Sequence, residues 1–560
     1  MTILTLNKKE LEEKIGKIDD KIRSKIDMFG TPVDDESDSE ISIEVFPNRP
    51  DLLSLEGFCR GFLGFLGKGK IKEYRVEKPD RDFKVVIDKS VKKVRPFTSC
   101  AIVKGIKFDE KRILEVIELQ EKLHGSFGRN RKKVAIGIYP LEEIKLPIKY
   151  YAKKPEEIKF RPLEFPREIN GRQILSQHPK GRDYAELLAG CDVFPIFEDA
   201  EGSILSMPPI INSEKTGKIS NSTKDVFVEC SGFDKEYLDK AINIISCALS
   251  DMGGKIYGME VEDGNDKYLS PNLESEKMEI EVEYVNRNLG LSLDDVEVKG
   301  LLGKMGIGCE KGKGKEGKGK GNLVALIPAY RNDILHEIDL VEEVAIAYGY
   351  DNFELEIPEI STIGEESRIS IMKNKIREIL VGLGLLEIST FHLSTKEKQF
   401  KRIGVKEFKD RMIEVLDSKT ENNVLRDSLF AQTIMVLSEN SDASYPQRIF
   451  EIGKVFRLDD GSDVGVREVE KLCVTLCSES VGFTEVRQIL DYLMRMLSVS
   501  YEVREGSREG FIEGRVGEVF VEGKSVGFLG EVKPSVLKNG RIGMPVASVE
   551  IGVDELIYPK

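Results

Sequence analysis

Helical periodicity near the start of the chain follows the turn VFPNRPD. Pro50 and Asp51 suit the first turn of a helix, because proline is favoured at the first helical position and acids complement the helix dipole. Apolar side chains then recur on one face, at Leu53, Phe58, Phe62 and Phe65. This pattern predicts a helix that packs into a core and carries no site.

Period-two alternation in residues 225–231 (DVFVECS) predicts a β-strand. Its two faces would carry Val226, Val228 and Cys230 on one side, and Phe227, Glu229 and Ser231 on the other. Glu229 and Ser231 would therefore lie side by side. Without further context, the simplest interpretation is a sheet face in contact with water.

A second buried strand is predicted at KLCVTLC, which contains Cys473 and Cys477. Apolar and β-branched residues alternate there, and the remaining cysteines of the chain are scattered. We therefore interpret this pair as buried strand residues rather than as a zinc site or a disulfide.

The chain is too long for one hydrophobic core, because 560 residues imply roughly three to five domains. We predict a multidomain α+β protein. The expected domains are an N-terminal α+β domain at 1–88, a mixed α/β domain at 89–268, a small helix-rich domain with an acidic helix at 272–356, and an α+β domain on an antiparallel sheet at 360–560.

The composition is that of an ordinary water-soluble protein, with 40% hydrophobic and 32% charged residues. No apolar run approaches the roughly 20 residues that span a bilayer. The N-terminus MTILTLNKKELEEKIGK is charged and amphipathic, unlike a signal peptide. We expect a cytoplasmic protein that makes no membrane contact.

A net charge of −14 argues against a protein that coats nucleic acid through bulk electrostatics. Contact with nucleic acid would need local basic patches. One candidate is the Lys/Gly tract KGKGKEGKGKG at residues 311–321, which predicts a solvated loop tip. The other is the basic run formed by Arg129, Arg131, Lys132 and Lys133. Either could also be a solvated run of charge with no partner.

Acidic residues gather in the segment IPAYRNDILHEIDLVEEVAIAYGY. At about 100° per residue, Asp339, Glu342 and Glu343 share one face of a helix. Asp333 lies upstream, where an extended approach could bring its carboxylate over the same face. Such an oxygen-rich site would suit Mg²⁺. The alternative is that acids merely complement the dipole in the first turns of the helix.

Seven motifs follow one another along the chain: VFPNRPDLLSLEGFCRGF, GRNRKKVAIGI, HPKGRDYAELLAG, LSMPPIIN, RNDILHEIDLVEEVAIAYGY, LRDSLF and FEIGKVF. In this order they closely resemble the beta subunit of the archaeal and eukaryotic type of phenylalanine–tRNA ligase. The resemblance covers nearly the whole chain, apart from the Lys/Gly tract and the extreme N-terminus.

The resemblance implies a heterotetramer of two alpha and two beta subunits that charges tRNA(Phe) with phenylalanine, using ATP and Mg²⁺. The alpha subunit would hold the catalytic site and its ATP, and residues 89–268 of this chain would form an editing domain that also meets tRNA. The basic run would contact phosphates of the tRNA acceptor arm. The Mg²⁺ site of the family, described as shared with the alpha subunit, maps onto Asp333, Asp339, Glu342 and Glu343.

The last domain would resemble a class II synthetase domain that has lost its chemistry, and its arginines agree with this. Such a site clamps ATP with arginines on two elements, because spread phosphate charge calls for bidentate contacts. Arg448 and Arg457 flank FEIGKVF. The C-terminal element, residues 528–556, contains only Arg541, in an expected loop. We predict that this domain is structural and pairs with the alpha subunit.

Editing has a physical basis, because a hydrophobic pocket rejects the extra hydroxyl of tyrosine only modestly, whereas a polar pocket can prefer it strongly. The editing pocket of the family falls on Phe197, Ser206, Asn212, Glu229 and Ser231. Glu229 could accept the hydrogen bond of the tyrosine hydroxyl, and the serines and Asn212 could orient the ester or a water. No Ser-His-Asp triad is evident, so hydrolysis would rely on positioning a water.

The chain departs from the family pattern at three places in this region. The family more often has Asp and Thr where Glu229 and Ser231 stand, and an aliphatic residue where Phe197 stands. Tyr139 and Pro140 replace the His-Asp pair expected after AIGI.

Two other functions stay open at this point: a free-standing aminoacyl-tRNA deacylase and a non-enzymatic tRNA-binding scaffold. A lone hydrolase would have no need of a catalytic-like domain as long as residues 360–560. This favours the beta subunit over the deacylase.

Overall fold

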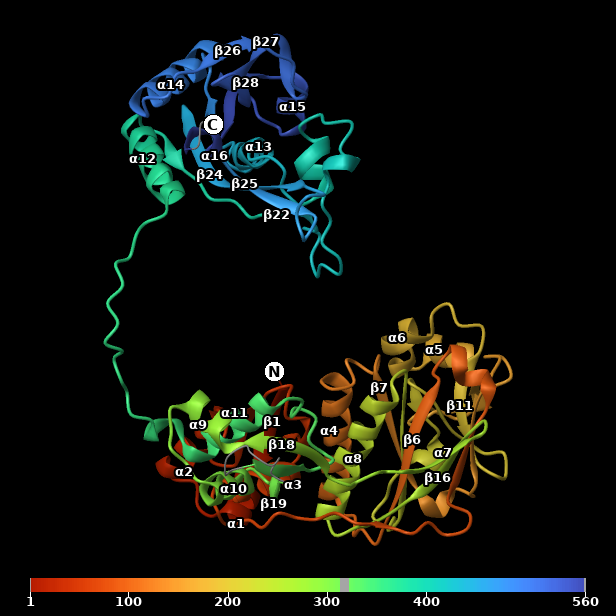
Figure 1. The fold of residues 1–560 in the computed structure, drawn as a ribbon. Helices are drawn as coiled ribbons and strands as arrows, with labels where there is room; N and C mark the ends of the chain where they lie inside the picture. Colours follow the sequence, from red (N-terminus) through yellow and green to blue (C-terminus); the bar gives the residue numbers. More distant parts are fainter. Residues whose placement is uncertain (1, 313–321, 558–560) are drawn as a thin grey trace. The chain divides into compact units, whose positions relative to one another are not determined.

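The computed structural model describes residues 2–312 and 322–557. The chain divides into two compact units, residues 1–356 and 357–560 (Figure 1), and each is described by itself. The prediction of a multidomain chain that mixes helices and sheets is confirmed.

The N-terminal part of the first unit is a small sheet packed by helices. Its elements are β1 (Thr2–Asn7), α1 (Lys8–Ile15), α2 (Asp20–Met28), β2 (Val33–Glu36), β3 (Glu40–Val45) and α3 (Leu55–Phe65), with strand order β1-β3-β2. The Ser54 hydroxyl caps α3 by accepting from the Gly57 amide at 3.1 Å. Phe58 and Phe62 are fully buried, so the predicted packing face is confirmed. The helix begins at Leu55 rather than at Pro50, because Pro50–Leu52 form a separate short 3₁₀ helix.

The middle of the first unit contains two sheets. A five-stranded sheet has the order β4-β15-β6-β14-β7 and a seven-stranded sheet the order β13-β12-β11-β8-β5-β16-β17. The strands are β4 (Val76–Glu77), β5 (Lys84–Ile87), β6 (Phe97–Lys104), β7 (Val134–Pro140), β8 (Ile148–Lys153), β11 (Phe194–Glu198), β12 (Ile204–Met207), β13 (Ile211–Asn212), β14 (Val226–Gly232), β15 (Lys255–Tyr257), β16 (Met259–Asp263) and β17 (Asp266–Ser270). The short strands β9 (Lys159–Phe160) and β10 (Ile169–Asn170) form a separate pair.

Helices α4 (Glu110–Gly125) and α8 (Lys235–Asp251) cover one face of the five-stranded sheet, and the seven-stranded sheet packs on the other face (Figure 1). Shorter helices lie in the connections: α5 (Gly171–Gln177), α6 (Pro179–Tyr184) and α7 (Glu214–Gly217). Val226, Val228 and Cys230 join the core under the helices, and Phe227 joins the core between the sheets. The predicted alternation along β14 is therefore confirmed.

The sheets of this region begin earlier than the predicted boundary at residues 88 and 89. Strand β4 pairs in parallel with β15, and β5 pairs in parallel with β16 and β8. At the other end, β17 runs to Ser270, past the predicted end at 268. Parallel pairing joins strands far apart in sequence, so no local pattern could have placed β4 and β5 in these sheets.

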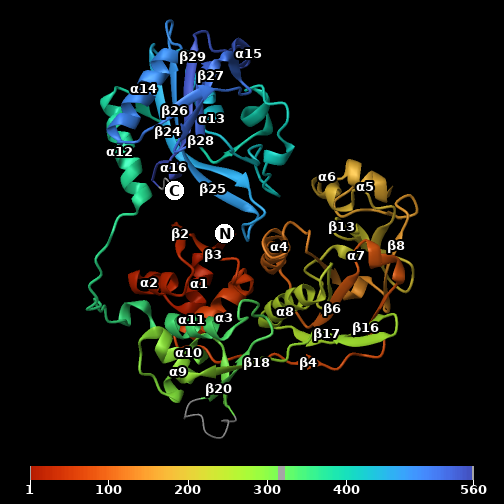
Figure 2. The same cartoon turned by 45° about the horizontal axis from the view of Figure 1, so that its top comes forward.

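The last part of the first unit packs three helices beside a three-stranded sheet (Figure 2). Its elements are β18 (Glu276–Glu281), α9 (Val282–Leu289), α10 (Asp295–Lys304), β19 (Gly308–Lys311), β20 (Asn322–Ile327) and α11 (Glu337–Tyr348), with strand order β18-β20-β19. Leu340, Val341 and Val344 of α11 enter the core. Most of the predicted Lys/Gly loop tip, residues 313–321, lies outside the described residues.

The second unit is built on a seven-stranded sheet with the order β21-β24-β25-β29-β28-β27-β26, antiparallel except for the β21–β24 pair. Its strands are β21 (Leu386–Glu387), β24 (Gln447–Leu458), β25 (Val466–Cys477), β26 (Glu502–Glu505), β27 (Phe511–Val521), β28 (Lys524–Val532) and β29 (Val546–Gly552), and β22 (Leu393–Ser394) pairs separately with β23 (Val424–Leu425). Cys473 and Cys477 are buried free thiols on β25, so the predicted buried strand is confirmed.

Helices α12 (Arg368–Gly382) and α14 (Phe483–Met496) pack on one face of this sheet. Helix α13 (Phe430–Glu439) packs on the other face, and α15 (Pro534–Asn539) and α16 (Asp554–Ile557) lie near the end of the chain. In residues 2–312 and 322–557, no helix has the length and apolar character needed to cross a membrane.

Candidate functional site

A cavity of about 400 Å³ lies where edge strand β7 approaches β12, β13 and α4. Its wall contains three of the five predicted pocket residues, Ser206, Asn212 and Glu229. Apolar residues of α4 and of the loop before β13 complete much of the wall, including Ile113, Ile117 and Ile210. A largely apolar cavity with a few convergent polar groups is typical of a small-ligand site.

Glu229 reaches this cavity from the middle of its sheet. On β14 it pairs with Cys100 of β6 on one side and with Gly137 of β7 on the other. The Tyr139 hydroxyl donates to its Oε1 at 3.1 Å. A Cβ atom at position 137 would lie 2.2 Å from the Tyr139 Oη and 2.6 Å from that Oε1. Only glycine at 137 therefore lets the phenol lean back along the strand to the carboxyl group.

The environment of Glu229 favours its neutral form. The side chain is only 2% exposed, and this burial raises the pKa of Glu229 to about 8, against the opposing effects of the Tyr139 hydroxyl, the Arg95 guanidinium and Ser231. Burial outweighs these partners because a buried carboxylate loses its hydration. Among the described residues, Oε2 of Glu229 has no hydrogen-bond partner. The carboxyl group thus keeps one oxygen that no group within the described ranges uses.

Ser206 and Asn212 come from the second sheet, where they pair directly in the β12–β13 register. The Tyr139 Oη lies 3.3 Å from the Asn212 Oδ1, which ties this side of the cavity to β7. The buried Ser206 Oγ has no hydrogen-bond partner in the part of the chain that the structure describes. Buried polar atoms without a partner in the protein are uncommon, so the Ser206 hydroxyl can bond a group that enters the cavity.

The other two predicted pocket residues, Ser231 and Phe197, lie away from the cavity wall, which corrects the predicted set. The Ser231 hydroxyl accepts a hydrogen bond from the Arg95 Nε at 3.1 Å, and the serine is fully buried. Phe197 stacks on Tyr150 with ring centroids 4.3 Å apart, inside the core between the two sheets. Alternation placed Ser231 on the correct face, but Arg95 covers that part of the face.

The basic run does not form one exposed patch. Arg129, Asn130 and Arg131 have positive φ angles of 48°, 53° and 64°, so the chain turns sharply there. Arg131 folds inward, where it donates to the Ile210 carbonyl oxygen at 2.8 Å and pairs with Glu121 at 2.8 Å. Arg131 is therefore removed from the predicted tRNA-binding surface and placed in the cavity wall.

Arg129 and Lys132 of the basic run remain exposed, while Lys133 is half-buried with its ammonium group 4.2 Å from the Tyr237 ring centroid. These three residues keep a smaller basic surface next to the cavity-lining Arg131.

Two histidines that the sequence analysis did not single out also line the cavity. The Nε2 of His124 accepts from the Ile136 amide at 2.8 Å, and burial lowers the pKa of His124 to about 4. His178 holds the Leu163 carbonyl oxygen with its Nε2 at 3.1 Å. His124 is thus neutral near pH 7 and shapes the wall. Gly137, the glycine of AIGI, was the sequence signal for this part of the cavity, because a glycine within a strand can mark a close approach of another group.

The acidic cluster is organised around a buried arginine. Arg331 is 1% exposed and pairs with Asp333 and Glu343, each at 2.8 Å. Asp339 begins the helix by accepting from the Leu335 and His336 amides at 2.7 and 2.8 Å. The four carboxylates therefore do not form one open face as predicted, because three of them have partners within the chain.

Glu342 differs from its neighbours, since it makes no ion pair within residues 2–312 and 322–557. Partial burial, followed by the charges of Glu343, Asp339 and Asp333, raises the pKa of Glu342. These carboxylates are close enough to repel one another, which a cation would relieve. Within the described ranges, however, no three His, Cys, Asp or Glu side chains are already arranged around an ion.

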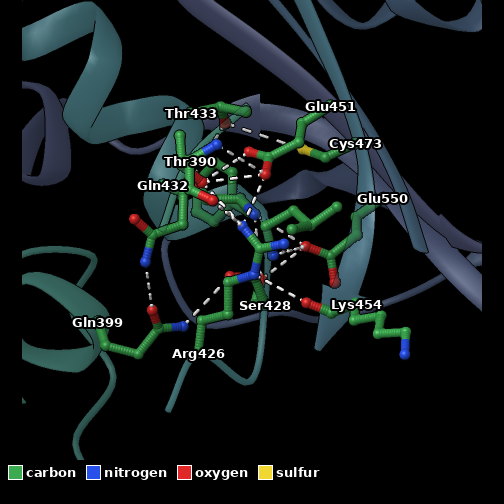
Figure 3. Close-up of polar contacts among 12 residues, drawn as sticks. Thr390, Gln399, Arg426, Ser428, Gln432, Thr433, Glu451, Lys454, Cys473 and Glu550 are labelled. Carbon is green, nitrogen blue, oxygen red and sulfur yellow. Dashed lines mark hydrogen bonds and ion pairs between the residues drawn. The ribbon is translucent and has the colours of Figure 1, made fainter. Parts of the chain in front are cut away.

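Buried polar groups on the α13 side of the second unit pair with one another (Figure 3). Arg426 bonds Glu451 at 2.6 Å, and both side chains are 2% exposed. Glu550 bonds the Lys471 ammonium group and accepts from the Ser428 hydroxyl at 2.6 Å. It also accepts from the Leu429 and Phe430 amides, at 2.9 and 2.8 Å, where α13 begins. The charges on this sheet face are thus largely balanced within the chain.

Similarity to known proteins extends along the whole chain. Residues 354–553 match the family model of the phenylalanyl tRNA synthetase beta chain CLM domain, and residues 278–350 match that of the tRNA synthetase B5 domain. The phenylalanine–tRNA ligase beta subunit of Archaeoglobus fulgidus is 39% identical over 556 residues, which cover 98% of each chain. That of Pyrococcus abyssi is 40% identical over 514 residues, covering 91% of this chain and 90% of the relative.

A solved structure is similar to part of this chain. The crystal structure of an N-terminal fragment of the phenylalanyl-tRNA synthetase beta subunit from Pyrococcus horikoshii has a TM-score of 0.58 and 36% sequence identity. It covers 62% of this chain and 99% of that chain.

Proposed function

The chain belongs to the phenylalanine–tRNA ligase beta subunit family, and on that premise we propose that it is the non-catalytic subunit of a complex that charges tRNA(Phe) with phenylalanine. The observation that carries this proposal is the end-to-end match to a relative of that name. The expected complex contains two alpha and two beta subunits.

The alpha subunit of this complex binds ATP and carries the reaction in our proposal. Two features of the second unit support this division of labour. The α13 side of its sheet is filled by side chains that pair with one another, such as Arg426 with Glu451. Arg541, the only arginine of the C-terminal element, lies exposed in a turn. Arg457 and Arg508 line a cavity of about 250 Å³ without an ion pair among the described residues, but Arg541 does not line it, so the C-terminal clamp on ATP is missing.

The beta chain supplies an editing site, which we assign to the cavity lined by Glu229, Ser206 and Asn212. The carboxyl group and the serine hydroxyl have atoms without hydrogen-bond partners among the described residues, so both can meet the hydroxyl or ester of an aminoacyl group. Hydrolysis of tyrosyl-tRNA(Phe) would follow from a water placed beside the ester. The apolar wall of the cavity suits an aromatic ring.

The exposed basic residues Arg129 and Lys132 bind the phosphates of the tRNA acceptor arm near this cavity. Each phosphate contact contributes about 0.7–0.9 to the slope of log affinity against log salt. Replacing both residues with glutamine should therefore lower that slope by about 1–2 in tRNA(Phe) binding measured between low and moderate salt. The same change at Lys255, an exposed lysine on β15, should leave the slope unaltered, and equal slopes for both variants would dismiss the patch.

In the assembled complex the acidic cluster would hold Mg²⁺, whose positive charge would offset the repulsion between carboxylates at the subunit boundary. Glu342 would be its principal ligand in this chain, with Asp333, Asp339 and Glu343 around it. Mg²⁺ commonly uses only one or two carboxylates and keeps several waters, so it can coexist with the Arg331 ion pairs. The site would thus serve assembly rather than bond making.

Glu342→Gln should lower the stability of the tetramer that Mg²⁺ confers, while the rate of phenylalanyl-adenylate formation in assembled enzyme stays within about twofold. Sedimentation with and without Mg²⁺ measures the effect. Asp351→Asn, at an exposed acid beyond the helix, is the control. Asp339→Ala should also weaken assembly, although loss of its backbone hydrogen bonds contributes. An unchanged tetramer with slowed adenylate formation would reverse the assignment.

Purification of the tagged chain from its native cells tests the proposed function as a whole. A second polypeptide in equal amount, with phenylalanylation by the pair and none by this chain alone, supports the beta subunit. A monomer that hydrolyses mischarged tRNA would favour a free-standing deacylase. A tRNA-binding monomer without either activity would favour a scaffold.

A further inference from the structure

Tyr139 lies behind the predicted pocket residues rather than among them. It is fully buried, stacks on Phe227 with ring centroids 5.7 Å apart, and is outside the cavity wall. Its hydroxyl meets two wall residues at once, Glu229 at 3.1 Å and Asn212 at 3.3 Å. This phenol therefore controls the orientation of polar groups that face the cavity.

We propose that Tyr139 is the positioning residue of this site: by donating to Oε1 of Glu229 it leaves Oε2 as the oxygen that meets the hydroxyl of an aromatic aminoacyl ester. The inference rests on the proposed editing function. Three observations carry it: the Tyr139–Glu229 bond, the absence of a partner for Oε2 in the described residues, and the open space that Gly137 leaves for the phenol.

The positions of the hydrogen atoms determine whether Oε2 of Glu229 donates or accepts a hydrogen bond. Tyr139 has one hydroxyl hydrogen, and its shorter contact is with Oε1 of Glu229 rather than with Oδ1 of Asn212. With that hydrogen on Oε1, the proton of a neutral Glu229 resides on Oε2, which then donates to the ligand. A tyrosine ester provides a phenol oxygen to accept that hydrogen bond. A phenylalanine ester leaves the buried donor unpaired, which disfavours its binding. The site would therefore prefer tyrosine through a donor rather than through a carboxylate acceptor.

Glu229 faces several titratable groups, and each bears on the pH dependence. Arg95 and the Tyr139 hydroxyl favour its ionised form, while burial opposes it. Tyr150, Cys100 and Cys230 also lie within its electrostatic reach, and each of them titrates well above neutral pH. As the pH rises, Glu229 therefore ionises before these neighbours, near pH 8, and loses the hydrogen that Oε2 donates. The preference for tyrosyl over phenylalanyl ester should fall as the pH rises through about 8.

The test measures hydrolysis of tyrosyl-tRNA(Phe) and phenylalanyl-tRNA(Phe) by the full chain with its co-purified partner. Tyr139→Phe keeps the ring and removes the hydroxyl. It should lower the tyrosyl to phenylalanyl ratio of kcat/KM by about tenfold, mainly through the tyrosyl KM, with phenylalanyl hydrolysis within about twofold of wild type. Tyr268→Phe, which removes a hydroxyl bonded to the Thr98 carbonyl oxygen at 3.3 Å, should leave the ratio unchanged.

The outcomes separate this inference from the proposed function. Wild type that fails to hydrolyse tyrosyl-tRNA(Phe) overturns the editing proposal and the inference with it. Wild type that hydrolyses it while Tyr139→Phe keeps the same ratio overturns the inference alone, as does an equal loss with both esters. A preference for tyrosine that increases above pH 8 would show that the ionised carboxylate accepts from the tyrosine hydroxyl, which also rejects the donor role.

Discussion

Replacing Glu229 with alanine should reduce hydrolysis of tyrosyl-tRNA(Phe) by about 100-fold or more while charging with phenylalanine stays at the wild-type rate. The side chain lines the cavity, is buried, and has one carboxyl oxygen without a hydrogen-bond partner among the described residues. A site built to hydrogen-bond a substrate hydroxyl loses most of its preference when the bonding group is removed, by factors of about 10⁴ in favourable cases. Single-turnover deacylation with excess complex measures the loss.

Glu229→Gln is the informative companion variant. Glutamine is isosteric, can accept from Tyr139 with its carbonyl oxygen, and can donate from its amide nitrogen. If Glu229 acts as a neutral donor, this variant should retain at least about a tenth of the wild-type rate, whereas alanine should not. If Glu229→Ala deacylates tyrosyl-tRNA(Phe) at the wild-type rate, the assignment of this cavity as the editing site is wrong.

Local patterns in the sequence predicted the strand that carries Glu229 but only part of its surroundings. Alternation along residues 225–231 correctly separated the helix-covered face from the face between the sheets. The same alternation could not show that Arg95, which precedes β6, covers Ser231. That contact depends on how a distant connection packs, and no periodicity within one strand reports it.

The resemblance led to Ser206 and Asn212, and the structure brings both to the cavity. It treated Tyr139 only as a departure from the family. The role inferred for Tyr139 depends on the space beside Gly137, which becomes visible only when β7 and β14 are paired in register.

The acidic cluster shows a second limit of sequence reasoning. Helical geometry grouped Asp339, Glu342 and Glu343, but it ignored Arg331, which lies close to Asp333 in the chain. The planar guanidinium group binds Asp333 through two nitrogens and also reaches Glu343, so the cluster is partly neutralised from within. A basic residue next to an acidic motif is the signal that would have found this arrangement.

Glu550 should be the most stability-determining carboxylate of the second unit. It is 1% exposed and joins β29 to Lys471 of β25 and to the start of α13. Breaking a buried pair by removing one partner costs about 3–5 kcal/mol, because the other charge stays buried alone. Glu550→Gln should therefore destabilise this unit by about 3 kcal/mol, measured by hydrogen exchange of β25 and β29 amides in the full chain.

Two further variants separate the contribution of the buried Glu550 charge from the other effects of the substitution on stability. Glu502→Gln removes a carboxylate whose side chain is 69% exposed and pairs with Arg504, and it should cost less than about 1 kcal/mol. The double variant Lys471→Met with Glu550→Gln removes both buried charges and should recover part of the lost stability. A double variant that is less stable than Glu550→Gln by the full cost of Lys471→Met alone would show that the two groups do not interact.

Acid provides an independent test of the same interaction. Burial opposes ionisation of Glu550, but Lys471, Ser428 and the Phe430 amide outweigh it and lower the pKa of Glu550 from 4.5 to about 2. Because the folded-state pKa is depressed, the stabilisation is fully present above pH 4.5 and is lost as the pH falls towards 2. Wild type and Glu550→Gln should thus differ most near neutral pH and converge below pH 4.5, whereas parallel acid profiles would exclude an ionised Glu550 as the source of the stability.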